Sequence, residues 1–395
     1  MNNNIPLIEI TALPKHSYFE WFLLGFYELE RHGKIRFQIH VDWTRTVAKY
    51  TSSRYINGPI KRWFRRSDSY NCEGYIHFLG KKIKFCIDCS DAPSSFDSKL
   101  MEEVACYFKM QCPISITESG FEIGEDMRAP WIDISHELDF KKHLVAFTNL
   151  SLIKQKVRPL MVGPRMLSWG ISYRALHNAY LNYTQGIANE ASRKMMCYFG
   201  NALGTKPYQI EDTTYYDFTE ISHYCPKFSH PNEKRKIAFD LMRTLGENYD
   251  ARLISDGKPG DPPTHPEMFI SRDEFCRHIS NFEYNLNISG LLMSIPNRFI
   301  ESFMVGTAIV TDKLALKWYK PFGCEVVETI PMGYLPMDEV NWAQFKNDII
   351  NLPPVNKKDI LHEFDTKWRP DVVAQYMIDE ILAAAEQQQY NKHLL

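Results

Sequence analysis

The stretch from Ser294 to Asp312, SIPNRFIESFMVGTAIVTD, constrains the fold more than any other part of the chain. Apolar residues at helical spacing are followed by Gly306 and then by a continuous apolar run, Ala308–Val310. The spacing predicts a helix of about a dozen residues that Gly306 ends. The apolar run predicts a parallel strand buried on both faces. Asp312 then falls at the carboxyl end of that strand, where open α/β sheets bind ligands.

Two charged residues lie near the start of the predicted helix. Arg298 and Glu301 are three positions apart and therefore share a helix face. The free N–H groups of a helix start favour a phosphate, and an arginine there can hold a diphosphate through two parallel hydrogen bonds. A glutamate one turn later can accept hydrogen bonds from a ribose diol. The alternative is an ordinary surface ion pair.

The pattern Pro-Asn-Arg-Phe-x-Glu, followed after four residues by Gly-Thr-Ala-Ile-Val, resembles the donor-site segment of GT-B glycosyltransferases. It is most similar to that of the exostosin-like and fucosyltransferase-like families. The resemblance covers Lys194 to Ala384, and the N-terminal half only in layout. It implies that Arg298 meets the nucleotide diphosphate and that Glu301 meets the ribose. It also implies transfer without a metal, because helix ends and basic residues neutralise the diphosphate.

The length and the order of predicted elements favour two domains. A chain of 395 residues is long enough for two domains of ordinary size, and strands alternate with helices in both halves. We therefore expect an α/β fold of two doubly wound Rossmann-like domains facing across a cleft. The predicted divisions are an acceptor-side domain (1–170), a connecting helix or linker (171–193), a nucleotide-sugar-binding domain (194–369) and a C-terminal helix that crosses back to the first domain (370–395).

Further donor contacts are predicted around two loops. Gly204 lies in the loop after the first strand of the second domain and allows close approach of the backbone to a ligand. Lys206 in the same loop can bind a phosphate as a point charge. The alternative is an ordinary glycine turn with an exposed lysine, which would have the same sequence pattern. Ser294 and Asn297 could add hydrogen bonds at the start of the helix.

An inverting transfer also needs a base for the acceptor hydroxyl, and we expect it in the first domain. Three residues fall in or beside loops after its predicted strands: Asp91, which we favour, Asp88 and His16. Lys109 and Arg165 could neutralise a leaving diphosphate. Each of these residues also has a simpler interpretation, as a turn cap or as a solvated charge.

Composition argues against several classes of protein. A net charge of −2 gives no case for nucleic-acid binding. The nine cysteines are scattered, with one close pair, so no zinc site is predicted and a reducing, cytoplasmic compartment fits best. The first half has no G-x-G-x-x-G, so no dinucleotide cofactor is indicated. No signal peptide or membrane-spanning run is expected, and a peripheral membrane contact is left open.

These observations predict a glycosyltransferase that needs no cofactor or metal. Its donor would be a nucleotide sugar, and its acceptor a glycan or lipid-linked saccharide of the surface-polysaccharide type. Two alternatives stay open: an epimerase-like enzyme that processes free sugar nucleotides, and a non-catalytic protein that binds glycans or nucleotides with the same fold.

Overall fold

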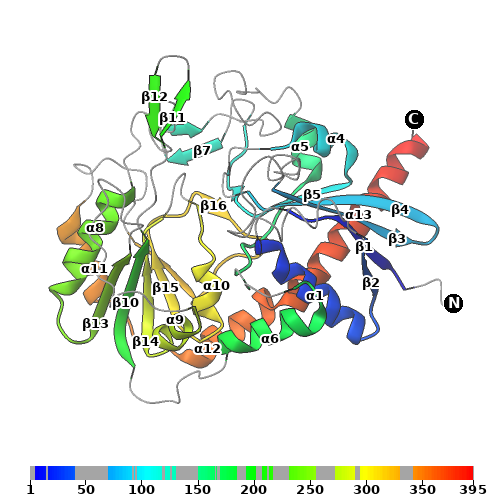
Figure 1. Cartoon of the computed structure of the whole chain (residues 1–395). Helices are drawn as coiled ribbons and strands as arrows, with labels where there is room; N and C mark the ends of the chain where they lie inside the picture. The colour runs from blue at the N-terminus through cyan, green and yellow to red at the C-terminus, as the bar shows by residue number, and fades with distance from the viewer. Residues whose placement is uncertain are drawn as a thin grey trace, which may run out of the picture.

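The computed structural model in Figure 1 is a mixed α/β protein with two large sheets. Its description covers residues 5–14, 17–40, 70–90, 93, 96–117, 121–124, 127–129, 150–164, 166, 170–184, 193–201, 207–210, 213–216, 231–254, 272–289, 294–329 and 341–394. One sheet lies at the right of Figure 1 and is built from the first half of the chain. The other lies at the left and is built from the second half. The predicted α/β class is therefore confirmed.

The first sheet has six strands in the order β2-β1-β3-β4-β5-β9. Most neighbours are parallel, but β3 runs antiparallel to both β1 and β4. The two-residue turn at Leu79 and Gly80 makes β3 antiparallel to β4, because so short a connection can join only antiparallel strands. This sheet is thus mixed rather than simply doubly wound. The strand bounds are β1 Leu7–Ala12, β2 Arg36–Ile39, β3 Asn71–Phe78, β4 Lys81–Asp88, β5 Cys106–Lys109 and β9 Val157–Pro159.

The second sheet has five parallel strands in the order β13-β10-β14-β15-β17. The strands are β10 Lys194–Asn201, β13 Tyr249–Ile254, β14 Phe282–Asn287, β15 Ala308–Thr311 and β17 Val326–Glu328. The helices α8 (Pro231–Arg243), α9 (Arg272–Ile279) and α10 (Arg298–Phe303) connect successive strands. Because the strands are parallel, each of these helices begins on the side of the sheet where the strands end.

The remaining elements cover the sheets or join their ends. The helices are η1 Ser17–Phe19, α1 Glu20–Arg31, α4 Ser98–Glu103, α5 Leu150–Lys156, α6 Tyr173–Thr184, α11 Trp342–Ile350, α12 Lys357–Glu363, the π-helical turn η6 Phe364–Trp368 and α13 Pro370–Leu394. Three two-stranded pairs complete the list: β6 Cys112–Pro113 with β16 Leu316–Lys317, β7 Phe121–Gly124 with β8 Met127–Ala129, and β11 Pro207–Ile210 with β12 Thr213–Tyr216.

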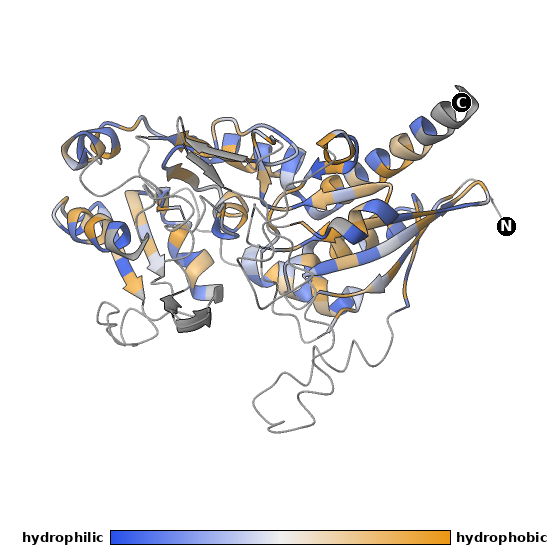
Figure 2. Cartoon of the chain, turned by 90° about the horizontal axis from the view of Figure 1, so that it is seen from above, coloured by the Kyte–Doolittle hydropathy of each residue, from blue (hydrophilic) through white to orange (hydrophobic). Residues whose placement is uncertain are grey.

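The last helix, α13, packs on the first sheet although it follows the second. It contacts α1, β4 and β5, and Figure 2 shows it extending beside the first-sheet strands. The approach to α1 is very close, since a Cβ added at Gly25 would collide with the backbone carbonyl of Pro370. The indole N–H of Trp21 donates to the carbonyl of Trp368 at 3.2 Å. A glycine at position 25 therefore lets the two helices meet backbone to backbone.

Two further contacts join the halves near the start of α10. The strands β6 and β16 pair antiparallel, which brings Cys112 beside Lys317. The buried amide of Gln111 donates to the carbonyl of Ile295 at 2.8 Å and accepts from its N–H at 3.0 Å. The segment that leads into α10 is thus held by a side chain from the other half of the chain.

The central stretch folds as the sequence predicts, with one difference in length. Helix α10 has six residues rather than a dozen, and the strand β15 follows it. Gly306 adopts a φ of +75° and a Cβ there would lie 2.5 Å from the Cγ of Lys357, so only glycine suits this turn. The helix is short because the segment from Ser294 to Asn297 does not take part in it. The predicted domain divisions and the cleft between domains stay predictions.

Candidate anion-binding site

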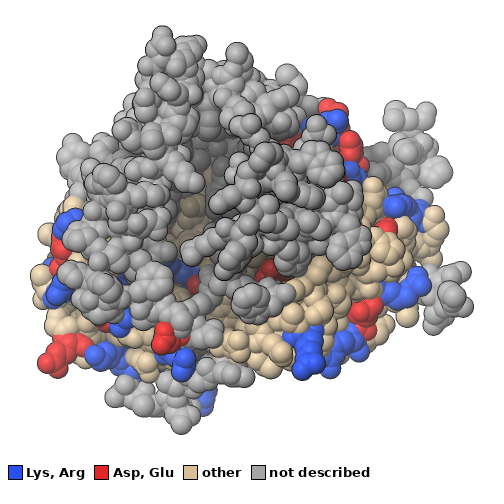
Figure 3. Space-filling model, in the orientation of Figure 1, with Lys and Arg blue, Asp and Glu red and all other residues tan. Residues whose placement is uncertain are grey.

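Arg298 is the first residue of α10 and lies at the carboxyl end of the second sheet. Its guanidinium donates to the main-chain carbonyl of Phe199, near the end of β10. Loss of hydration is the main cause of a lowered pKa at Arg298, and the nearby Tyr198 and Glu301 oppose that shift. On the described part of the face in Figure 3, basic and acidic side chains are interspersed.

A second arginine, Arg235 of α8, lies close enough to Arg298 to feel its charge. The pKa of Arg235 is lowered to about 10, chiefly by burial and in smaller part by the positive charge of Arg298, while Tyr198 and Asp312 oppose the shift. The hydroxyl of Tyr198 donates to the main-chain carbonyl of Arg235 at 3.3 Å. The neighbouring Lys234 is fully buried as well. Arg298 contacts the Phe199 carbonyl and the main chain of Arg235 contacts the Tyr198 hydroxyl, so both arginines belong to the surroundings of the end of β10. Two arginines within electrostatic range of each other are suited to an anion.

Asp312 is buried at the end of β15 and accepts hydrogen bonds from residues that follow the ends of β14 and β15 or lie there. Its Oδ1 accepts from the hydroxyl of Ser289 at 2.6 Å, from the N–H of Ser289 at 3.1 Å and from the hydroxyl of Thr311 at 3.1 Å. The amide of Asn287 donates to Thr311 at 3.2 Å, while its Oδ1 has no hydrogen-bond partner among the described residues. This edge therefore carries a fixed negative charge and an acceptor atom next to the arginine pair.

The other predicted donor residues lie around the same helix. The amide of Asn297 donates to Oε1 of Glu301 at 2.8 Å, and Glu301 is almost fully buried. Ser294 is half-buried just before this segment. The structure therefore places Arg298, Glu301, Asn297 and Ser294 together in one short segment. Their roles with a nucleotide stay predictions.

Asp88 and Lys109 meet each other at the end of the first sheet. Their ion pair is 2.6 Å long and both side chains are fully buried. Oδ2 of Asp88 also accepts from the hydroxyl of Tyr107 at 2.9 Å, and Oδ1 accepts from the N–H of Ser90 at 2.8 Å. Since both oxygens of Asp88 already accept hydrogen bonds, the pair shapes the loop that follows β4. Neither side chain contacts solvent, where an acceptor or a diphosphate would arrive.

Five predicted site residues lie outside the described part of the chain. They are the candidate bases Asp91 and His16, the phosphate contact Arg165, and the loop residues Gly204 and Lys206. Their roles stay predictions.

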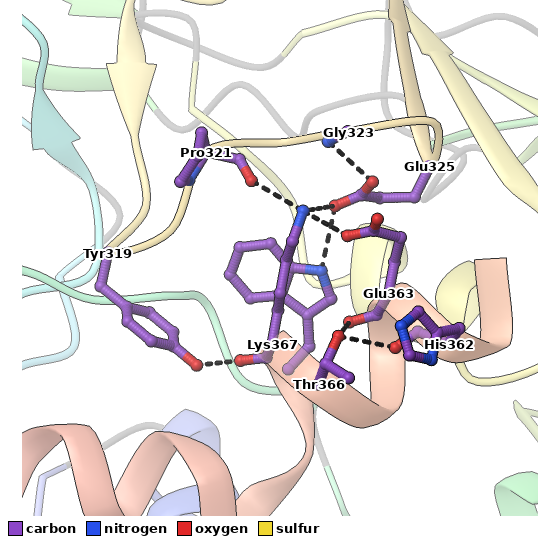
Figure 4. A network of polar contacts seen from close by, with 9 residues as sticks. Tyr319, Pro321, Gly323, Glu325, His362, Glu363, Thr366 and Lys367 are labelled. Atoms are coloured by element: carbon purple, nitrogen blue, oxygen red, sulfur yellow. Dashed lines mark hydrogen bonds and ion pairs between the residues drawn. The ribbon is translucent and has the colours of Figure 1, made fainter. Parts of the chain in front are cut away.

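One group of side chains among the described residues has the chemistry of a metal site. Cys324, Glu325 and Glu363 could offer ligand atoms that lie close together. Figure 4 shows that the ammonium of Lys367 reaches both glutamates, ion-pairing with Glu363 and lying 3.5 Å from Oε1 of Glu325. The indole of Trp368 donates to the same oxygen at 3.2 Å. The lysine already supplies the positive charge that these carboxylates need, so we do not assign a metal to this group.

Sequence reasoning missed Arg235 and Gln111. Arg235 stands within Asn-Glu-Lys-Arg-Lys, where nothing in the pattern separates it from the exposed Lys236. Gln111 contacts a residue 184 positions away. The available signal for each was its position relative to strand ends, because Gln111 follows shortly after the end of β5 at Lys109 and α8 begins at the carboxyl side of the second sheet.

No family model and no curated protein matches the chain. Similar solved structures include a mutant of a flavo di-iron protein from Thermotoga maritima, with a TM-score of 0.21 and 10% identity, covering 91% of this chain and 88% of that one. A flavoprotein from the same organism gives a TM-score of 0.22 and 11% identity, with the same coverage. Likeness this weak carries no argument about fold, flavin or iron. The predicted membership of a GT-B glycosyltransferase family was wrong, since no family matches and the similar structures are flavo di-iron proteins.

Within the described residues, no helix is long and apolar enough to cross a membrane.

Proposed function

We propose that the chain is a transferase that binds a nucleotide sugar at the carboxyl edge of the second sheet and passes the sugar to a glycan or lipid-linked saccharide. The observation that carries the proposal is the position of Arg298 at the end of β10, within electrostatic range of Arg235, whose main chain contacts Tyr198 of the same strand. The proposal rests on this site and not on any family.

The electrostatics of the arginine pair favour a ligand with two adjacent negative groups. Burial lowers the pKa of both arginines, and the charge of Arg298 adds to the lowering at Arg235. Asp312 offsets part of the positive charge. A diphosphate would accept hydrogen bonds from planar guanidinium groups, which is the geometry that arginine binds best.

The same contacts would serve the chemistry of transfer. When the bond between sugar and diphosphate breaks, negative charge develops on the leaving oxygen, and prearranged cations at that place lower the barrier. Oδ1 of Asn287 is a buried atom that can accept a hydrogen bond from a hydroxyl of the bound ligand. We assign to Asp88 a positioning role, because it holds the backbone at Ser90 on the loop that carries the candidate base Asp91.

The first test compares two arginines of the same helix. Arg235 lies near the start of α8, beside the end of β10, and Arg243 lies exposed at the far end of α8. Binding of a panel of nucleotide sugars to the R235Q and R243Q variants is measured by calorimetry. We expect R235Q to weaken binding by about 10- to 150-fold, the value of a hydrogen bond to a charged group. R243Q should bind as the parent does.

R298K is the second variant, since it keeps the charge and loses the planar fork. We expect it to weaken binding while leaving the thermal transition near that of the parent. Equal binding by R235Q, R298K and the parent would exclude this site. Binding without donor consumption, over a broad acceptor panel, would indicate the non-catalytic alternative. Conversion of the donor to an isomer without any acceptor would indicate the epimerase-like alternative.

A further inference from the structure

The start of β1, the start of β2 and the turn between β3 and β4 lie together at one end of the first sheet. The register pairs Leu7 with both Arg36 and His77, and it pairs His77 with Lys82. In Figure 1 the β3–β4 turn lies at the right, close to the N-terminus, and in Figure 2 the same hairpin projects from the body. We call this surface the hairpin edge. It comprises residues 5–8, 33–37 and 77–83.

The hairpin edge is positively charged. Lys34, Arg36, Lys81 and Lys82 are exposed on it, and the three segments contain no aspartate or glutamate. Among the described residues no carboxylate forms an ion pair with the first three, while Lys82 lies 3.6 Å from Glu9 of the neighbouring row. The whole chain has a net charge of −2, so this concentration of positive charge is local.

Leu79 stands at the tip of the hairpin in a position that suits leucine poorly. Its φ is +47° and that of Gly80 is +76°, the left-handed pair of a tight hairpin turn. Such turns favour Asn-Gly, because a branched side chain crowds the backbone at positive φ. The Leu79 side chain is 63% exposed, so packing compensates little for this strain. Neither the turn nor the core explains a leucine here, whereas an external apolar partner would.

We propose that the hairpin edge docks on the surface of a bilayer that contains anionic lipid. Leu79 enters the boundary between headgroups and acyl chains, and Lys34, Arg36 and Lys81 meet the lipid phosphates. An exposed leucine beside exposed basic residues matches this boundary, because binding there combines apolar burial with attraction to anionic headgroups. A nucleic acid would use the charge but would gain little from an exposed leucine at the tip.

The test is co-sedimentation of the full chain with vesicles. One set is pure phosphatidylcholine, and the other contains equal parts of phosphatidylcholine and phosphatidylglycerol. We expect binding to the anionic set alone, weakened by salt. L79N should lower the partition coefficient about ten-fold. The K34E/K81E double variant should lower it by about 25-fold or more, since each positive charge near an anionic surface contributes about five-fold.

Matched control variants make the same kinds of substitution at exposed positions in the second half of the chain. I350N removes another exposed apolar side chain, and K320E/K346E reverses two exposed lysines of the second half. Both should bind as the parent does. The proposal is overturned by equal binding to both vesicle sets, by no binding to either, or by controls that lose as much binding as the hairpin variants. Binding of a labelled oligonucleotide without vesicle binding would overturn it in favour of nucleic acid.

Discussion

Replacement of Gln111 by methionine tests how the two halves of the chain are held together at the candidate site. The Gln111 amide makes two hydrogen bonds to the backbone of Ile295, at 2.8 and 3.0 Å, and its side chain is buried. Methionine fills a similar volume and makes neither bond. The carbonyl and the N–H of Ile295 would then be left buried without partners, at about 1–3 kcal/mol each. We therefore expect Q111M to lower the free energy of unfolding by about 3 kcal/mol.

Urea denaturation followed by tryptophan fluorescence measures the change. The control is Q344M, because Gln344 is exposed and its amide donates to Asp348 on the same helix. That control should stay within about 0.5 kcal/mol of the parent. Q111E should also destabilise, since a carboxylate can still accept from the N–H but cannot donate to the carbonyl. If Q111M unfolded at the same urea concentration as the parent, the contact would not be holding the segment before α10.

Two further predictions concern the first sheet. L79N should raise the free energy of unfolding by about 1 kcal/mol, because asparagine tolerates the left-handed turn better than leucine, and a loss of stability in urea would contradict this. The pKa of Glu9 is lowered from its ordinary value of 4.5, chiefly by the hydrogen bond with His77. The Glu9 carboxylate therefore stabilises the fold above pH 4.5, and this contribution is lost as the pH falls through its lowered folded-state pKa. E9Q should be less stable than the parent at neutral pH by no more than about 1 kcal/mol, and the difference should vanish in acid. A difference that persisted at low pH would contradict the assignment.

The parts of the fold that the sequence predicts are those in which local pattern and burial agree. The apolar run at Ala308–Val310 is a strand buried on every residue, as its composition requires. The sequence also predicts the two strands on either side of Gly80 and the amphipathic helix before Gly33. In the structure both glycines adopt a positive φ, which glycine allows at little cost. The sequence does not indicate a strand at Val157–Pro159, which lies in a basic segment that contains a proline. The structure makes it the edge strand β9, where proline is tolerated.

The candidate site is less predictable from the sequence, for a physical reason. Arg298 could be proposed from its place at the start of a helix, but its partner Arg235 comes from a different helix, much earlier in the chain. Only the order of strands in the sheet places β10 between β13 and β14, and so brings α8 and α10 to the same strand end. Asp88 and Lys109 were each predicted to face a ligand, and the structure pairs them with each other. A buried charge is satisfied by the nearest opposite charge, which single-residue reasoning does not consider.

The most direct test of the arginine site is a calorimetric titration of the chain with inorganic pyrophosphate, which carries the charge of a diphosphate without a base or a sugar. The account predicts binding at a single site that salt weakens and that R235Q and R298K both impair, with R243Q unchanged. No heat of binding, or equal binding by the parent and R235Q, would contradict the claim that Arg235 and Arg298 form an anion-binding site.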